Sequence, residues 1–382
     1  MEFAMWAYPW DFMDRGPETV ESRLRDIGIT EVNLATNYHT VQAFTPHNPE
    51  RRTVFAKASS YFTPSAEYDR LRPVSFERMD EDWVNAIANQ LSELSLTAWT
   101  VGCHNSRLGM KNRECTLESA HGGDLVFGLC PSNPAVQTYL TTLVSDLASR
   151  DGIDRIELET FDYFYGTGFG WHHQKIHVRL GMLGEFLLGL CFCPHCRTAA
   201  TSSGVDVQRA RSVVAGTIDE IIAGDVPHDR RPEEWLREHG SVAAYTDVRE
   251  ETLVSLYAEL STAAGSTPLG YYVGAPDPGR EWMVGADLEA LSTHVDYYCL
   301  PAYESSAEEV MDAYRAVDDV VGGHPVHVGL LPAHPAVYDE ESVVNMLAEL
   351  QSRDVPRVSF YNYGLLPPES FEWIGTAIDV VS

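Results

Sequence analysis

Short apolar or aromatic strand patterns alternate with helical patterns along this chain, and this alternation limits the possible folds more than any other feature. Strands separated by helices predict parallel β-α units, and eight such units close as a (β/α)8 TIM barrel. We therefore expect an α/β fold with one barrel domain over residues 1–382. The expected strands lie at 3–8, 31–36, 96–102, 155–160, 269–274, 295–300, 326–331 and 358–363.

A doubly wound open sheet is the alternative fold. It usually carries a glycine-rich phosphate-binding turn after its first strand. Here that turn is Pro9-Trp10-Asp11-Phe12, which contains no glycine, so the barrel is favoured. Helical patterns fill most intervals between the strands, at 19–26, 82–94, 134–150, 232–264, 286–293, 306–320, 340–352 and 368–380.

The regular spacing breaks after the fourth expected strand. Residues 161–231 are many more than one crossover needs, so we expect an inserted, helical and cysteine-rich segment over the barrel mouth. Another long connection, residues 40–73, follows the second strand. The apolar piece 124–129 suggests an added hairpin strand.

The fourth expected strand carries carboxylates at alternate positions. Side chains alternate between the two faces of a strand, so Glu157 and Glu159 point one way while Ile156 and Leu158 point the other. Acidic side chains on one face of a buried strand do not serve apolar packing, so we expect them to have another role. This pattern is typical of an active-site strand.

In a TIM barrel the active site forms at the C-terminal ends of the strands and in the loops that follow. Those ends are rich here in aromatic, amide, imidazole and carboxylate groups, which suit a sugar because rings pack on its apolar faces and polar groups bind its hydroxyls. The expected substrate-binding residues are Trp10, Asp11, Asn37, His39, Trp99, His104, Tyr163, Trp171, His172, His173, Asp277, Arg280, Tyr303, Asn362 and Tyr363.

Cleavage of a glycosidic bond needs two carboxyl groups, one of them protonated. Glu159 is the expected acid or acid/base, because apolar and aromatic neighbours at the end of strand four would raise its pKa. Glu304 is the expected partner, with Asp162 and Asp277 next. The alternative is structural: Glu157 and Glu159 would pair with internal arginines such as Arg155 or Arg280.

Three cysteines, Cys191, Cys193 and Cys196, have a spacing suited to Zn²⁺, which needs four ligands. His195, or His172 and His173 from the preceding loop, would complete the shell. We expect such a metal to be structural rather than catalytic. The alternative is reduced cysteines packed as small hydrophobic groups, which is also the expectation for Cys103, Cys115, Cys130 and Cys299.

The chain carries 27 basic and 56 acidic residues, a formal net charge of −29, and this balance limits its partners. Salt screens such self-repulsion, so a halophilic cytoplasm is favoured over an ordinary acidic enzyme from a GC-rich genome. Nucleic acid and anionic membranes are excluded as partners, because no basic stripe is present to bind phosphates. The odd count of 7 cysteines fits a reducing, cytoplasmic location.

Several short motifs resemble one group of proteins. Glu159 on strand four, Leu129–Pro134 before it, Cys191–Cys196 after it, Trp282–Leu288, and Phe360–Gly364 on strand eight are similar to uncharacterised, hypothetical glycosidase-like TIM-barrel proteins. Together with the charge, this resemblance suggests a haloarchaeal source. It implies a carbohydrate-active barrel whose fourth strand carries a catalytic carboxylate.

The chain departs from one common pattern. Many retaining barrel glycosidases place their nucleophile after strand seven, where this chain has Leu330–His334 and no carboxylate. The retaining or inverting outcome therefore stays open, as do the sugar, the linkage and a homo-oligomeric state.

The leading hypothesis is a glycoside hydrolase-like enzyme that acts on a glycan or oligosaccharide. A second is a metal-dependent sugar isomerase or epimerase, in which Glu159, His172, His173 and Asp277 hold Mn²⁺ or Zn²⁺. A third is a glycan-binding barrel without catalytic activity.

Overall fold

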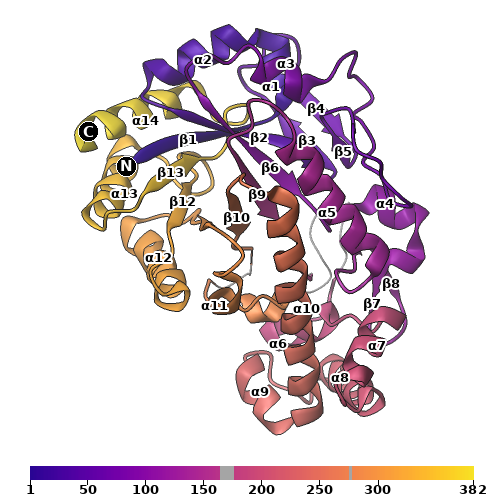
Figure 1. Cartoon of the computed structure of the whole chain (residues 1–382). Coiled ribbons are helices and arrows are strands. Elements are labelled where there is room, and N and C mark those ends of the chain that lie inside the picture. The colour runs from indigo at the N-terminus through magenta and orange to yellow at the C-terminus, as the bar shows by residue number, and fades with distance from the viewer. Residues whose placement is uncertain (164–175, 275–277) are drawn as a thin grey trace.

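The computed structural model describes residues 1–163, 176–274 and 278–382. In these residues eight parallel strands form a closed ring, with the last strand paired to the first and the first paired to the second (Figure 1). The predicted (β/α)8 barrel is therefore confirmed. The barrel strands are β1 (Glu2–Ala7), β2 (Glu31–Tyr38), β6 (Ser95–Val101), β9 (Arg155–Glu159), β10 (Leu269–Tyr272), β11 (Tyr297–Pro301), β12 (Val326–Leu330) and β13 (Arg357–Phe360).

Contacts across the ring identify the side chains that fill its interior. Arg357 on β13 pairs with Glu157 on β9 at 3.6 Å, although three strands separate them in the sheet. Trp6 on β1 meets Tyr272 on β10 in an edge contact at 6.2 Å between ring centroids. The N-terminal layer of the interior is thus charged and the layers above it are aromatic.

Glycines make room for these large rings. A Cβ added to Gly329 on β12 would lie 2.6 Å from the ring of Trp6, and one added to Gly270 on β10 would lie 2.3 Å from the ring of Tyr297. Real Cβ atoms do not come this close to carbon, so both positions require the absence of a side chain. The interior of the barrel is consequently a packed core.

Helices surround the ring and follow the predicted order (Figure 1). Helix α5 begins as expected, with the Asn133 side chain accepting from the Ala135 backbone and Pro134 in the first turn. The pattern predicted over 232–264 is wrong in one respect, because the helix breaks at His239. The helices that surround the ring are α2 (Pro17–Asp26), α3 (Trp83–Ala88), α5 (Pro134–Ala148), α9 (Pro232–Glu238), α10 (Gly240–Ala264), α11 (Leu288–Leu291), α12 (Ala307–Val321), α13 (Glu340–Ser352) and α14 (Pro368–Val381).

Additional elements occupy the loops between barrel units. Three helices, α6, α7 and α8, lie in the long connection after β9 and pack with α9 and α10 below the ring in Figure 1. The hairpin strand expected at 124–129 is confirmed, because β8 pairs antiparallel with β7. These elements are α1 (Pro9–Arg15), β3 (Val41–Phe44), β4 (Thr53–Ala56), β5 (Ser59–Ser60), α4 (Ser106–Lys111), η1 (Arg113–Cys115), β7 (Thr116–Glu118), β8 (Asp124–Leu129), α6 (Gly181–Gly189), α7 (Pro194–Ser202), α8 (Val207–Ala223) and η2 (Glu281–Val284).

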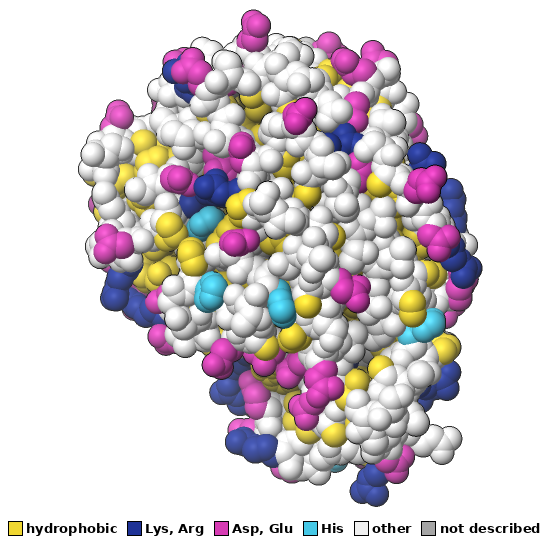
Figure 2. All heavy atoms as spheres, in the orientation of Figure 1, with side chains coloured by type: hydrophobic (Ala, Val, Ile, Leu, Met, Phe, Trp, Pro, Cys, Tyr) yellow, Lys and Arg dark blue, Asp and Glu magenta, His cyan; other side chains and the backbone are white. Residues whose placement is uncertain are grey.

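The surface reflects the acidic composition. On the face in Figure 2, Asp and Glu side chains are spread over most elements rather than gathered into one patch. Within the described residues, no helix combines the length and the apolar character needed to cross a membrane.

Candidate active site and metal centre

Glu159 is the last residue of β9 and stands at the C-terminal end of the barrel interior. Its side chain is half-buried, and the indole nitrogen of Trp99 on the adjacent strand β6 donates to its Oε2 atom at 2.5 Å. The next residue, Thr160, has φ +52°, in the left-handed region that β-branched residues rarely adopt. Strain of this kind often accompanies functional sites. The backbone thus turns sharply after it presents Glu159 to the mouth.

Tyrosines surround this carboxylate. Burial raises the pKa of Tyr38, Tyr272, Tyr303 and Tyr361, and the negative charge of Glu159 adds to the rise in all four, so all four rings lie near it. Tyr303 and Tyr361 face each other at 5.4 Å between ring centroids, and both are half-buried. These two rings are accessible at the mouth.

The tyrosines on β10 and after β13 were not among the expected site residues. Tyr272 lies two residues beyond Gly270, and Tyr361 two residues beyond Ser359. Since side chains repeat every second residue along a strand, both continue the inward-facing series. Extending the every-second-residue pattern to the ends of these strands would have identified both tyrosines.

The environment of Glu159 favours a proton at neutral pH. Burial raises its pKa to about 7, the nearby charge of Asp162 adds to the rise, and the bond from Trp99 opposes it. A carboxyl group with such a pKa can hold a proton and then donate it, as a general acid must.

Asp162, the second expected carboxylate, follows β9 closely. It is 5% exposed, and the Tyr271 hydroxyl donates to its Oδ2 atom at 2.7 Å. Burial raises its pKa to about 7 against the opposing effects of the Tyr271 bond and the Arg249 charge. Glu304, the other expected partner, is half-buried on the loop after β11 and has no hydrogen bond or ion pair within the described part of the chain.

The structural alternative applies to Glu157 and not to Glu159. Glu157 is fully buried and pairs with Arg357 at 3.6 Å, so its partner is not the Arg155 suggested by the sequence. Among the described residues, no arginine or lysine forms an ion pair with Glu159. The two carboxylates of the same strand thus lie in different layers, one paired and one facing the mouth.

Residues Trp10 and Asp11, expected to bind substrate, belong to helix α1. Trp10 is fully buried and stacks on Tyr8 at 4.4 Å. Asp11 is 3% exposed, and its Oδ2 atom accepts from the Tyr8 backbone at 3.0 Å, which caps the helix. This burial argues against the expected sugar contacts, because neither side chain has an accessible face.

Three further expected residues also make internal contacts. The Asn37 amide donates to the Val101 carbonyl at 2.6 Å, and the Asn362 side chain accepts from the Gly364 backbone at 3.1 Å. Tyr363 is buried, and its backbone donates to the Trp6 carbonyl at 2.8 Å. These contacts stabilise the loops around the mouth and leave the three side chains little room for a ligand.

The two described histidines of the expected set lie together. His39 is half-buried and stacks on the buried His104 at 4.5 Å between ring centroids. The ring of Tyr38 lies 4.2 Å from that of His39 and 4.5 Å from that of Trp99. Burial lowers the pKa of His39, so its ring is neutral near pH 7. This pair borders the aromatic group around Glu159.

The remaining expected residues divide into two groups. Tyr163 is fully buried, and Arg280 binds Glu233 of α9 at 2.8 Å, which links the loop after β10 to α9. Four expected residues lie outside the described part of the chain: Trp171, His172, His173 and Asp277.

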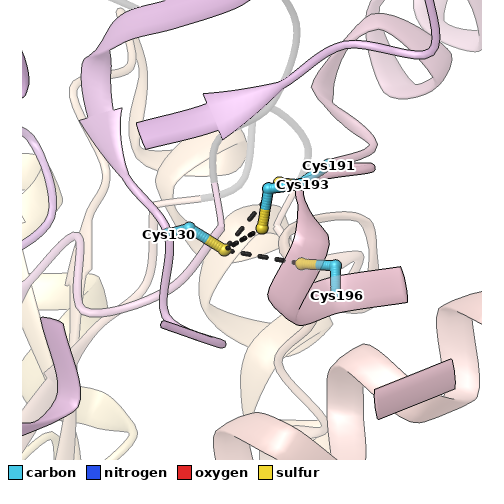
Figure 3. Close-up of side chains that lie close together, drawn as sticks. All are labelled: Cys130, Cys191, Cys193 and Cys196. Atoms are coloured by element: carbon cyan, nitrogen blue, oxygen red, sulfur yellow. Dashed lines mark hydrogen bonds between the residues drawn. The ribbon is translucent and has the colours of Figure 1, made fainter. Parts of the chain in front are cut away.

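A separate centre is formed by Cys130, Cys191, Cys193 and Cys196. Their four sulfur atoms lie within 4.8 Å of one another and point together in Figure 3. From the Sγ atom of Cys130, the other sulfurs lie at 3.4 Å (Cys196), 3.6 Å (Cys193) and 3.8 Å (Cys191). A tetrahedral ion with metal–sulfur bonds of about 2.3 Å separates its sulfurs by about 3.8 Å, so the four residues fit a metal ion.

The surroundings of these cysteines also fit a cation. Burial raises the pKa of the Cys130 and Cys191 thiols, so a positive ion would be needed to hold them as thiolates. The Glu118 backbone N–H donates to the Cys191 sulfur at 3.4 Å, a contact that orients a ligand atom.

The three clustered cysteines lie together as the sequence predicts, but the fourth member of the group is not the expected His195. Cys130, expected to be a small packing residue, joins the three thiols in place of His195. His195 lies in the first turn of α7, where its ring is half-exposed. Cys130 is 61 residues from Cys191, and the fold brings them together because the Phe192 backbone donates to the Glu118 carbonyl at 2.7 Å.

Comparison with known proteins gives structural likeness only. No protein-family model and no curated protein matches the chain. The PgaB (BpsB) glycoside hydrolase domain from Bordetella bronchiseptica is 14% identical, with a TM-score of 0.61 over 100% of this chain and 98% of that domain. A class V chitinase from Pseudomonas fluorescens Pf-5 is 10% identical, with a TM-score of 0.52 over 99% of each chain.

A β-galactosidase from the psychrophilic Marinomonas ef1 is 10% identical, with a TM-score of 0.58. The match covers 100% of this chain but 59% of the galactosidase, so the chain spans little more than half of that enzyme. All three neighbours are glycoside hydrolases. The likeness establishes the fold.

Proposed function

We propose that the chain is a glycoside hydrolase in which Glu159 is the general acid. The observation that supports this most is the environment of that one carboxyl group. It stands at the end of the fourth barrel strand, is half-buried, has a pKa raised to about 7, and makes no ion pair with any described residue. The glycoside hydrolase neighbours agree with this proposal at the level of the fold.

In the proposed reaction, protonated Glu159 donates its proton to the oxygen of the glycosidic bond as that bond breaks. A second carboxylate then forms a bond to the sugar or activates water. Asp162 and Glu304 are the candidates for this step. The charge of Asp162 already acts on Glu159, whereas Glu304 is the more accessible of the two.

The accessible rings of Tyr303 and Tyr361 would pack on a sugar, and the hydroxyl groups nearby would bind its hydroxyls. The Tyr8 and Tyr361 hydroxyls lie 3.2 Å apart, and those of Tyr272 and Tyr303 lie 3.5 Å apart. A lining of neutral, ring-bearing side chains suits a glycan or oligosaccharide substrate.

The test is a glycan array followed by hydrolysis assays with the glycans that bind. We expect the wild type to bind and cleave, and Glu159→Gln to bind with similar affinity while turnover falls by about 10²–10⁴-fold. Glu304→Gln and Asp162→Asn, assayed in parallel, identify the second carboxylate. A wild type that binds a glycan and cleaves none would contradict the proposal and support a glycan-binding barrel.

We also propose that the four cysteines bind a structural Zn²⁺ ion. Four thiolates in tetrahedral arrangement form a closed shell without an open position for substrate, which is typical of structural zinc. We expect metal analysis to find zinc in the wild type and to lose it in Cys193→Ser, with a lower melting temperature. Cys115→Ser, which removes a buried thiol outside the cluster, should keep the metal. Zinc retained at full content in Cys193→Ser would contradict this assignment.

A salt-rich cytoplasm is the proposed location. The net charge of −29 supports it, as do the 7 cysteines, which form no disulfide bond.

A further inference from the structure

A chain of hydroxyl contacts connects the four-cysteine centre with the segment that follows Glu159. The Sγ atom of Cys196 lies 3.3 Å from the Oγ atom of Ser132. Ser132 in turn forms a hydrogen bond with the hydroxyl of Tyr163. Tyr163 directly follows Asp162, so two side-chain contacts separate the cluster from a carboxylate of the candidate active site.

Tyr163 is held firmly on its other sides. Its backbone N–H donates to the Val284 carbonyl at 3.0 Å, and the Arg249 guanidinium lies 4.5 Å from the centre of its ring. Gly285 has φ +83°, and a Cβ at this position would lie 2.8 Å from the ring. The backbone, the ring and the hydroxyl of Tyr163 are therefore all contacted, and the side chain is fully buried.

The position of Tyr163 in turn determines that of Asp162. The two residues share a peptide bond, and the Asp162 carboxylate reaches the Tyr271 hydroxyl at 2.7 Å on the far side. A displacement of Tyr163 would lengthen or break this bond. The charge of Asp162 would then act differently on Glu159.

A bound metal ion would give the chain of contacts one direction. A cysteine that ligates a metal is a thiolate and can only accept a hydrogen bond. Ser132 then donates to Cys196, and its oxygen is left to accept from Tyr163. Without the metal, Cys196 can itself donate to Ser132, and the hydroxyl of Tyr163 loses its fixed acceptor.

We propose that the metal centre positions Asp162 through Ser132 and Tyr163, which act as positioning residues. The proposal rests on metal binding by the four cysteines and is tested without any assay of hydrolysis. Failure of the proposed glycosidase activity would therefore leave its test intact.

The experiment is hydrogen–deuterium exchange of the peptide that contains the Tyr163 amide, in the metal-loaded protein. We expect Tyr163→Phe and Ser132→Ala to keep the metal and to exchange this amide about tenfold faster than the wild type, since each removes one hydroxyl of the chain of contacts. Ser132→Thr keeps the hydroxyl on the half-buried side chain at this position, so the amide should exchange at the wild-type rate.

Tyr61→Phe is the matched control. Tyr61 is fully buried like Tyr163, its hydroxyl has no partner among the described residues, and it lies beside Trp10. It should leave exchange at Tyr163 unchanged. Metal removal by a chelator should reproduce the effect of Tyr163→Phe at this amide.

Three results would overturn the proposal. The first is wild-type exchange at Tyr163 in both Tyr163→Phe and Ser132→Ala. The second is a Ser132→Thr protein that exchanges as fast as Ser132→Ala. The third is metal removal that accelerates exchange equally throughout the barrel, which would show that the metal stabilises the whole fold and does not specifically position Tyr163.

Discussion

At the scale of single residues, the proton affinity of Glu159 depends on neighbours with opposing effects. Burial and the charge of Asp162 raise its pKa, and the indole N–H of Trp99 lowers it, to a value of about 7. In its proposed role as general acid, Glu159 acts only when it is protonated. Activity limited by this group should therefore fall as the pH rises through about 7.

Replacing Trp99 by Phe removes the hydrogen bond that favours the charged carboxylate. The pKa of Glu159 should rise, and the alkaline limb of the pH–kcat/KM profile should move up by about one pH unit, since a bond to a charged group is worth about 1.5–3 kcal/mol. Trp10→Phe is the control, because that indole nitrogen has no partner in the described residues. A limb that stays in place or moves down in Trp99→Phe would contradict the role of this bond.

Residues of the site differ in how far the sequence could predict them. The position of Glu159 at the end of the fourth barrel strand was predictable, because strand alternation and strand ends depend only on local pattern. Trp10 was assigned to the sugar site because the sequence did not show that helix α1 begins at Pro9. In this helix the indole ring of Trp10 is buried and stacks on the ring of Tyr8. Cys130 was missed because its partners are brought near by the tertiary fold, over 61 residues of chain.

At the scale of elements, the N-terminal layer of the barrel is a charged network. Arg357 of β13 is fully buried and pairs with Glu31 of β2 at 2.8 Å, Glu157 of β9 at 3.6 Å and Glu2 of β1 at 3.6 Å. One arginine thus connects three other strands of the ring. Breaking a buried pair from one side is costly, because the opposite charges stay buried without a partner.

Arg357→Met should therefore destabilise the fold by about 3–5 kcal/mol at pH 8. Burial already raises the pKa of Glu157 to about 7, and loss of the nearby arginine would raise it further. A carboxyl group whose pKa is higher in the folded than in the unfolded state destabilises the fold increasingly as the pH rises from the unfolded-state pKa to the folded-state pKa. The loss caused by Arg357→Met should therefore be smaller at pH 5. Denaturant unfolding at both pH values measures the difference.

The control for this prediction is Arg357→Met combined with Glu157→Gln. Removing the unpaired carboxylate should recover part of the lost stability at pH 8 and little at pH 5. The same loss of stability at both pH values in the single variant would show that packing, rather than charge, explains the effect.

The order of the elements was predictable from the sequence, and their ends were less so. All eight strand patterns correspond to barrel strands, because short apolar runs between helical patterns leave few alternatives. The break at His239 was not predicted, since an apolar helical pattern continues on both sides of it. The β3–β4 hairpin within residues 40–73 was also missed, because its residues alternate only over four positions per strand.

At the scale of the whole molecule, the net charge of −29 makes stability depend on salt. The Debye length shortens from about 10 Å at 0.1 M salt to about 3 Å at 1 M, which screens repulsion between exposed carboxylates. The melting temperature should therefore rise as KCl increases over this range. At a pH near 4, where many carboxylates are protonated, the rise should be smaller; a melting temperature independent of salt near pH 7 would contradict adaptation to high salt.

The central claim is that the barrel presents Glu159 as a proton donor to a glycosidic oxygen. The most direct measurement compares Glu159→Gln with the wild type on glycosides of one sugar that differ only in the pKa of the leaving group. A dinitrophenolate leaves without a proton, whereas an alkoxide needs one. We predict that the variant keeps most activity on the dinitrophenyl glycoside and loses about 10²–10⁴-fold on the alkyl glycoside. An equal loss on both substrates, or no loss on either, would contradict the claim.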